Sequence, residues 1–234
     1  MQDNPNRWRT LAQGAWDYFR HPELRDPWGG PFNNQQARQA LFQALLQAFR
    51  PWAIVETGAY RGSTTEYFAG TGLPVFSAEL DLHAYAFSRA RLWRAANVRI
   101  SNGDSRAVLR EWLDGPIGTG RGANTFFYLD AHWGEDLPLA EEIDLIFARC
   151  PDAIVMIDDF EVPGDGGYGF DDYGPGKALN AGYIGPAMKA HGLAAFYPST
   201  PAASESGALR GCVVLAKAQL HGQTLAGLSL LRAA

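Results

Sequence analysis

The sequence has few cysteines, no excess of positive charge and no long apolar segment, and each absence excludes a class of protein. Two cysteines, Cys150 and Cys212, cannot build a disulfide framework. The net charge is −5, from 20 Lys and Arg against 25 Asp and Glu, whereas binding to a phosphate backbone needs clustered basic residues. No apolar run reaches the length of about 18 residues typical of a transmembrane helix, and residues 1–19 lack a signal-peptide core. We therefore expect a soluble, cytoplasmic protein that binds neither nucleic acid nor membrane.

The composition is that of a globular protein, and the chain divides into two regions. Apolar residues make up 47% of the 234 positions, which excludes a disordered or collagen-like chain. Residues 1–34 show no clean periodicity, so we predict an N-terminal extension with one short helix near residues 8–19. Residues 35–234 are predicted to form the main domain. The Trp-rich extension suits contact with a second subunit, so a homo-oligomer is one expectation.

Short apolar segments alternate with helical patterns through the main domain. Strands are predicted at 53–55, 75–78, 98–100, 125–129, 153–157, 193–197 and 212–216. Helices are predicted at 35–49, 63–68, 82–95, 105–113, 137–148 and 184–191. Continuous apolar strands that alternate with helices are typical of a parallel sheet buried on both faces. We therefore predict an α/β, Rossmann-like fold with a mostly parallel central sheet and helices on both faces.

Acidic residues follow five successive strands of this predicted sheet. They are Glu56, Glu79, Asp104, Asp130 and the pair Asp158-Asp159. Parallel sheets bind ligands beyond the carboxyl ends of their strands. The sequence therefore predicts that these acids gather along one edge and form a site there.

The turn after the first strand is rich in glycine. Gly58 allows the backbone to turn sharply and a ligand to approach it, and Gly62 with Ser63 opens a helix whose free N–H groups favour an anion. Glu79 lies 23 positions after Glu56, close to the spacing of about 20 at which nucleotide-binding units place a ribose-binding acid. The alternative is an ordinary strand-to-helix turn capped by Ser63.

This turn has the pattern E-x-G-x-x-x-G and lacks the G-x-G-x-x-G that a dinucleotide oxidoreductase needs. A ligand with ribose and adenine but no pyrophosphate fits better, and the turn resembles motif I of class I methyltransferases that use S-adenosylmethionine (SAM). The resemblance implies a set of cofactor contacts. They are Glu56, Gly58, Tyr60, Gly62, Ser63 and Glu79, with Asp104 and Ser105 near the adenine. The alternative role of Asp104 or Ser105 is to cap the following helix.

Three carboxylates at one edge, those of Asp130, Asp158 and Asp159, would repel one another unless a cation neutralised them. Oxygen ligands of this kind suit Mg²⁺. The stretch Leu129-Asp130-Ala131-His132-Trp133 resembles the fourth-strand region of cation-dependent O-methyltransferases of the catechol O-methyltransferase group, with one extra residue, Ala131. The Asp158-Asp159 pair is similar to that of macrocin-type enzymes, which methylate sugar hydroxyls of natural products with Mg²⁺. The alternative is that Asp158 caps a turn and Asp159 is solvated.

The residues and the resemblance together predict an O-methyltransferase that transfers the methyl group of SAM to a hydroxyl of a small molecule, such as a sugar or natural product, with help from Mg²⁺. His132 is the predicted proton acceptor, beside Asp130. The long loop 160–176 is predicted to be a lid or substrate wall that offers Tyr168, Phe170 and Tyr173, or else a mobile surface loop. Two other functions stay open, an NAD(P)-dependent oxidoreductase and a non-catalytic, methyltransferase-like binding domain.

Overall fold

The computed structural model describes residues 5–118, 124–132 and 136–233. Its strands are β1 (Ala53–Thr57), β2 (Val75–Glu79), β3 (Val98–Asn102), β4 (Thr125–Leu129), β5 (Ile154–Asp158), β6 (Leu193–Pro198), β7 (Cys212–Lys217) and β8 (Leu231–Ala233). Its α-helices are α1 (Pro5–Arg20), α2 (Gln36–Phe49), α3 (Ser63–Ala69), α4 (Leu82–Arg91), α5 (Ser105–Asp114), α6 (Leu139–Arg149), α7 (Ala181–His191) and α8 (Ala218–Ala226). No helix within the described ranges is long and apolar enough to cross a bilayer.

The strands form one sheet in the order β3-β2-β1-β4-β5-β7-β6-β8. Strands β1 to β5 pair in parallel, and β7 runs antiparallel to both β5 and β6. The predicted α/β fold with a mostly parallel sheet is therefore confirmed. Because the chain order reverses at β1, between β2 and β4, a crevice opens beyond the carboxyl ends of these three strands. The short β8 and the helix α8 were not predicted from the sequence.

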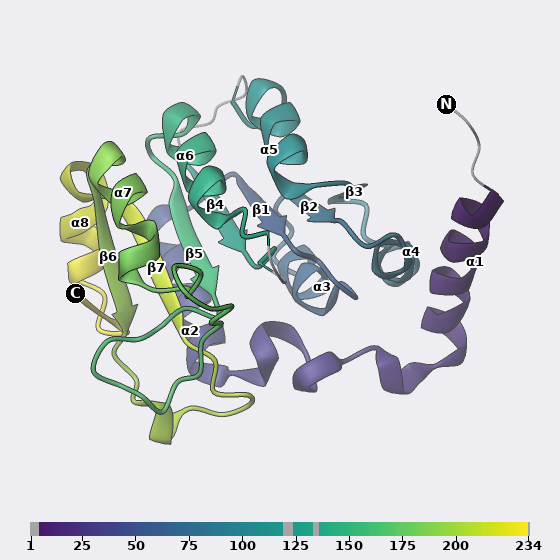
Figure 1. The fold of residues 1–234 in the computed structure, drawn as a ribbon, viewed down its shortest axis with the longest axis horizontal. Coiled ribbons are helices and arrows are strands. Elements are labelled where there is room, and N and C mark those ends of the chain that lie inside the picture. Colours follow the sequence, from purple (N-terminus) through teal and green to yellow (C-terminus); the bar gives the residue numbers. More distant parts are fainter. Residues whose placement is uncertain (1–4, 119–123, 133–135, 234) are drawn as a thin grey trace.

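Side chains alternate along the strands between two apolar layers, which explains the continuous apolar segments. Val55, Phe127 and Ile157 pack in one layer with α5, α6 and α7. Phe126 and Met156 belong to the other layer, with α2, α3 and α8. The sheet is thus covered by helices on both faces (Figure 1). A parallel sheet with both faces covered keeps only its strand ends free for chemistry.

The predicted N-terminal extension packs against the main domain. Helix α1 lies on α4 so closely that a Cβ on Gly14 would stand 2.3 Å from the carbonyl oxygen of His83. From α1 the chain crosses the edge at which the parallel strands end and enters α2 (Figure 1). Phe32, in the short helix Pro31–Asn34, is buried beside the rings of Phe42 and Tyr128, with centroids 5.4 and 5.2 Å away. The crossing segment is therefore anchored in the core.

Replacing Phe32 with alanine tests this anchor. We expect Phe32→Ala to lower the free energy of unfolding by about 3 kcal/mol, because it removes a buried ring and leaves a cavity. Urea denaturation followed by circular dichroism measures the change. Phe19→Ala is the matched control, since Phe19 is 57% exposed and its loss should change stability by less than about 0.5 kcal/mol. Equal effects of the two substitutions would show that Phe32 anchors nothing.

Candidate functional site

A cavity of about 560 Å³ opens beyond the carboxyl ends of β1, β2 and β4. It contains five of the residues that the sequence predicts to bind a cofactor. They are Gly58, Tyr60, Glu79, Asp104 and Ser105. Arg106 and Asp136, which no motif in the sequence had indicated, also line it. The volume lies within the range of ordinary small-molecule sites.

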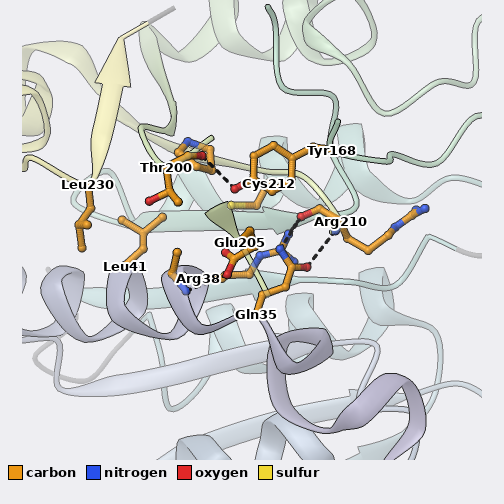
Figure 2. Close-up of a pocket in the computed structure, with 11 residues that line it drawn as sticks. Gln35, Arg38, Leu41, Tyr168, Thr200, Glu205, Arg210, Cys212 and Leu230 are labelled. Carbon is orange, nitrogen blue, oxygen red and sulfur yellow. Dashed lines mark hydrogen bonds between the residues drawn. The ribbon is translucent and has the colours of Figure 1, made fainter. Parts of the chain in front are cut away.

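A second, much smaller cavity of about 10 Å³ lies between α2 and β7. Gln35, Arg38 and Arg210 line it (Figure 2). A space of this size holds at most one water molecule. It is therefore excluded as a cofactor site, although its polar lining matters for the geometry described below.

Gly58 brings the first turn against the end of β4. Its φ is 82°, in the left-handed region, and a Cβ there would stand 2.1 Å from the carbonyl oxygen of Asp130. The N–H groups of Gly58 and Ala59 both donate to the carbonyl of Ala78, at 3.0 Å. Only glycine satisfies both the backbone angle and this contact. The turn therefore joins the floor of the 560 Å³ cavity to the acids that follow β4.

Glu79 is held by backbone donors. Its carboxylate accepts from the N–H of Tyr60 at 2.6 Å and from the N–H of Asp81 at 2.7 Å. Burial raises the pKa of Glu79, although these two donors act in the opposite direction. A carboxylate fixed in this way at the cavity wall retains acceptor capacity for further donors, such as vicinal hydroxyls.

Asp104 fulfils both of the roles that the sequence left open. It caps α5 by accepting from the N–H groups of Arg106 and Ala107, at 2.9 and 3.4 Å. It also lines the cavity beside Ser105. The guanidinium of Arg106, 2.6 Å away, lowers the pKa of Asp104.

The other three predicted cofactor residues lie outside the lining of this cavity. Glu56 is buried, and its carboxyl accepts from the hydroxyls of Thr65 and Ser77. Gly62 packs against α4, where a Cβ would stand 2.9 Å from that of Ser88. Ser63 is the first residue of α3 and makes no capping hydrogen bond, because Gly62 occupies the cap position. Glu56 and Gly62 therefore serve the packing of the turn.

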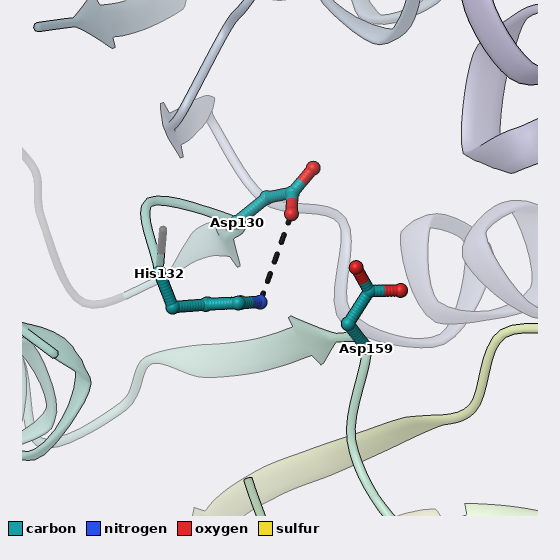
Figure 3. A group of neighbouring side chains, drawn as sticks. All are labelled: Asp130, His132 and Asp159. Atoms are coloured by element: carbon teal, nitrogen blue, oxygen red, sulfur yellow. Dashed lines mark ion pairs between the residues drawn. The ribbon is translucent and has the colours of Figure 1, made fainter. Parts of the chain in front are cut away.

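Asp130, His132 and Asp159 converge beyond β4 and β5 (Figure 3). One ligand atom from each lies within 4.8 Å of the others, and Nε2 of His132 is 3.7 Å from Oδ1 of Asp130. His132 is 1% exposed, and within the described part of the chain neither ring nitrogen has a hydrogen-bond partner. A buried imidazole without partners that faces two carboxylates is an uncompensated arrangement. A bound cation would compensate it.

The protonation of this cluster follows from its burial. Burial lowers the pKa of His132 to about 4, so the imidazole is neutral at pH 7. Burial and the neighbouring charge of Asp159 raise the pKa of Asp130 well above its usual range. Both shifts arise because charged forms are poorly solvated there. A neutral imidazole beside carboxylates is a donor set that divalent metals accept.

Asp158 does not join this cluster. As the last residue of β5 it follows the alternation of Ile154 and Met156 and points towards α2. There it is 2% exposed, pairs with Arg38 and accepts from the hydroxyl of Tyr128 at 2.5 Å. The sequence had grouped Asp158 with Asp130 and Asp159 as metal ligands. The structure places His132 in the third position instead.

A cavity of about 500 Å³ adjoins the cluster, and its lining includes Trp28, Asn33, Asp171, Tyr173 and Arg210. Arg210 binds the carboxylate of Asp159 at 2.6 Å and pairs with Asp171. The sequence analysis had missed Arg210, which carries no motif. Two walls of this cavity therefore come from segments far from each other in the sequence, the N-terminal crossing segment and the loop 160–176.

The loop 160–176 is tied to the domain by its own side chains. The hydroxyl of Tyr173 donates to Asp171 at 2.6 Å and contacts the carbonyl of His132. Tyr168 is buried and donates to the carbonyl of Thr200 at 3.0 Å. Tyr173 thus lies at the predicted wall, whereas Tyr168 packs in the core and Phe170 lines neither large cavity. Trp133, quoted with the fourth-strand motif, lies outside the described residues.

The fold can now be compared with known proteins. No protein-family model matches the sequence, and no curated protein matches it. The O-methyltransferase TomG of Streptomyces achromogenes, solved with SAM, aligns over 89% of both chains with a TM-score of 0.52 and 17% identity. The O-methyltransferase of Bacillus cereus, solved with S-adenosylhomocysteine (SAH), aligns over 93% of both chains with a TM-score of 0.54 and 14% identity. The chain therefore has the Rossmann-like fold of the SAM-dependent O-methyltransferases.

The buried Glu56 carboxyl makes stability depend on pH. Burial raises its pKa from 4.5 to about 7, so the folded protein keeps a proton that the unfolded chain releases near pH 4.5. Its stabilising contribution is complete below pH 4.5 and is lost as the pH rises to 7, with a loss of up to about 3 kcal/mol. Glu56→Gln should remove this loss, seen as a smaller difference between unfolding free energies at pH 5 and pH 8.

The matched control is Glu111→Gln, because the Glu111 side chain is 65% exposed. It should keep the wild-type pH dependence. The buried Glu142, whose pKa burial also raises to about 7, contributes equally to all three proteins. An unchanged pH dependence in Glu56→Gln would show that Glu56 is ionised in the folded state.

Proposed function

We propose that this protein is a SAM-dependent O-methyltransferase that methylates a hydroxyl of a small molecule with the help of a divalent cation. One observation carries the proposal. A cofactor-sized cavity lined by Ala131 and a second cavity lined by Asp130 and Asp159 border adjacent residues after β4, beside the buried imidazole of His132 and where the strand order reverses. Methyl transfer from SAM requires this layout, because the donor and the acceptor must approach in line from opposite sides.

The 560 Å³ cavity is the proposed SAM site. Glu79 would accept from the two ribose hydroxyls, because its carboxylate is already oriented by the N–H groups of Tyr60 and Asp81. Asp104 and Ser105 would border the adenine at the start of α5. The backbone of Gly58 and Ala131 lines this cavity, so the methionine part of SAM would pass along it towards Asp130.

The residues of the cluster fit a divalent cation. Asp130 and Asp159 supply oxygen ligands, and the neutral imidazole of His132 supplies nitrogen in the form that a metal requires. When bound, such a cation lowers the pKa of a coordinated hydroxyl and fixes its position. A ligand role suits His132 better than the proton-accepting role expected from the sequence, since a pKa of about 4 makes it a weak base. The two carboxylates suit Mg²⁺ or Mn²⁺, while the imidazole nitrogen suits a softer divalent metal better than Mg²⁺.

The 500 Å³ cavity is the proposed acceptor site. The indole of Trp28 and the ring of Tyr173 offer apolar faces on which an acceptor ring can pack. Asn33 and Asp171 supply polar atoms for its hydroxyls. Trp28 also lies 5.4 Å from the ring of Tyr60, which lines the SAM cavity. The two aromatic rings would therefore mark the boundary between the two substrates.

Two other functions considered from the sequence are not favoured. A nicotinamide-dependent oxidoreductase would need the pyrophosphate turn that the first turn lacks, and the solved structures compared above are O-methyltransferases. A non-catalytic binding domain would have no use for a buried imidazole that faces two carboxylates and, among the described residues, makes no hydrogen bond. A hydroxyl-methylating enzyme accounts for both cavities and for the cluster.

The cofactor assignment predicts the effect of Glu79→Ala on affinity. We expect SAH to bind at least about tenfold more weakly, because the loss of hydrogen bonds to a charged group costs about 1.5–3 kcal/mol. Isothermal titration calorimetry measures the dissociation constant. Asp114→Asn, at an exposed site on α5, is the control and should bind SAH as the wild type does. Wild-type affinity in Glu79→Ala would remove Glu79 from the cofactor site.

The metal assignment predicts that EDTA abolishes methyl transfer and that added Mg²⁺ or Mn²⁺ restores it. Asp159→Asn should lower the affinity for Mn²⁺ at least about tenfold, because a charged ligand is lost, while SAH binding stays unchanged. Electron paramagnetic resonance of free Mn²⁺ and transfer of a labelled methyl group to hydroxylated acceptors are the measurements. Full activity of the wild type in EDTA would contradict the metal assignment and leave the SAM assignment standing.

A further inference from the structure

We propose that Arg38 and Asp158 are positioning residues that hold Asp159 in the geometry needed for the cation. This inference rests on the metal site proposed above and adds two residues to it that do not touch the cation. Arg38 is on α2, 120 positions before Asp158. Neither side chain is more than 3% exposed. Their pairing therefore connects the helix layer to the strand end that carries Asp159.

The first contact is between Asp158 and the backbone of Asp159. Oδ1 of Asp158 accepts from the N–H of Asp159 at 2.9 Å. Asp159 has a φ of 51°, in the left-handed region, which is costly for a residue with a side chain. Asp158 continues the alternation of β5 and points towards α2, whereas Asp159, directly after the strand, faces Asp130 and His132. The carboxylate of Asp158 thus fixes the strained residue that the cluster needs.

The second contact is between Arg38 and the backbone of Arg210. The guanidinium of Arg38 that pairs with Asp158 also donates to the carbonyl of Arg210. Gln35, one helical turn earlier, donates to the same carbonyl at 2.9 Å and accepts from the N–H of Arg210 at 3.0 Å (Figure 2). The side chain of Arg210 then reaches Asp159 at 2.6 Å. One guanidinium therefore controls both the backbone of Asp159 and the residue that holds its carboxylate.

The burial of the pair explains why its geometry is rigid. A buried charge that loses its partner is strongly destabilising, so Arg38 and Asp158 must stay together in the folded state. The hydroxyl of Tyr128 donates to Oδ2 of Asp158 at 2.5 Å and fixes the other carboxylate oxygen. The cavity beside Arg38, at about 10 Å³, has no room for a ligand. The pair therefore supports Asp159 without touching the cation. Groups that hold metal ligands from behind in this way change the affinity for the metal about 10- to 100-fold.

The test is the Mn²⁺ affinity of the SAH-bound protein, measured by electron paramagnetic resonance well below the melting temperature. We expect Arg38→Gln and Asp158→Asn each to weaken Mn²⁺ binding about tenfold or more, while the dissociation constant of SAH stays within about twofold of wild type. Tyr128→Phe, which removes one hydrogen bond and keeps the ring, should weaken Mn²⁺ binding about threefold. If Arg38→Gln does not fold, the Mn²⁺ affinity of Tyr128→Phe tests whether the support around Asp158 affects the cation site. Arg149→Gln is the matched control, because it breaks an exposed Arg–Asp pair with Asp114.

Two results would overturn the inference. Wild-type Mn²⁺ affinity in Arg38→Gln and Tyr128→Phe, with a loss in Asp158→Asn as large as that in Asp159→Asn, would make Asp158 a ligand of the cation. Wild-type affinity in all three support variants would make the pair purely structural. If the wild-type protein binds no Mn²⁺, the proposed metal site itself is wrong. This outcome is distinguishable from the other two, because both of those require a wild-type protein that binds Mn²⁺.

Discussion

Crowding of carboxylates at one edge of a buried sheet is the constraint on which the rest of the site depends. Like charges in a poorly solvated place cannot all stay ionised without partners. The protein resolves this differently at each strand end. Glu79 receives backbone N–H groups, and Asp158 receives a guanidinium and a phenol hydroxyl. Asp159 receives the guanidinium of Arg210, whereas Asp130 faces the neutral imidazole of His132, where a bound cation would add the compensation that the protein supplies elsewhere.

The reversal of strand order places this edge between two substrates. Gly58 allows the turn after β1 to touch the chain after β4, so the cofactor cavity and the carboxylate cluster share a wall. The crossing segment closes the other side, and its Trp28 meets Tyr60 above that wall. The proposed cofactor cavity is thus built from strand ends and the start of α5, whereas the second cavity is lined by segments added around the sheet. The division follows from topology, because the faces of the sheet are already covered by helices.

Much of this could be predicted from the sequence. Apolar segments ending in acids predicted the parallel sheet and the edge at which Glu79 and Asp130 now lie. The side of Asp158 could also have been predicted, since Ile154 and Met156 precede it at alternate positions of one strand. The partner of Asp158 could not be predicted, because Arg38 belongs to a helix and reaches Asp158 only when α2 packs on the sheet. The burial of His132 likewise has no sequence signal, since it depends on tertiary contacts such as that of Tyr173, in the loop 160–176, with the His132 carbonyl.

The crossing segment has a consequence for how the protein can diversify. Four of its residues with side chains, Trp28, Phe32, Asn33 and Asn34, have left-handed backbone angles, each of which costs about 1–3 kcal/mol and persists only where packing enforces it. The ring of Phe32 supplies that packing, while Trp28 and Asn33 project into the acceptor cavity. Substitutions at the exposed Trp28 and the half-buried Asn33 would therefore reshape this cavity in descendants, while the ring of Phe32 keeps the segment in place.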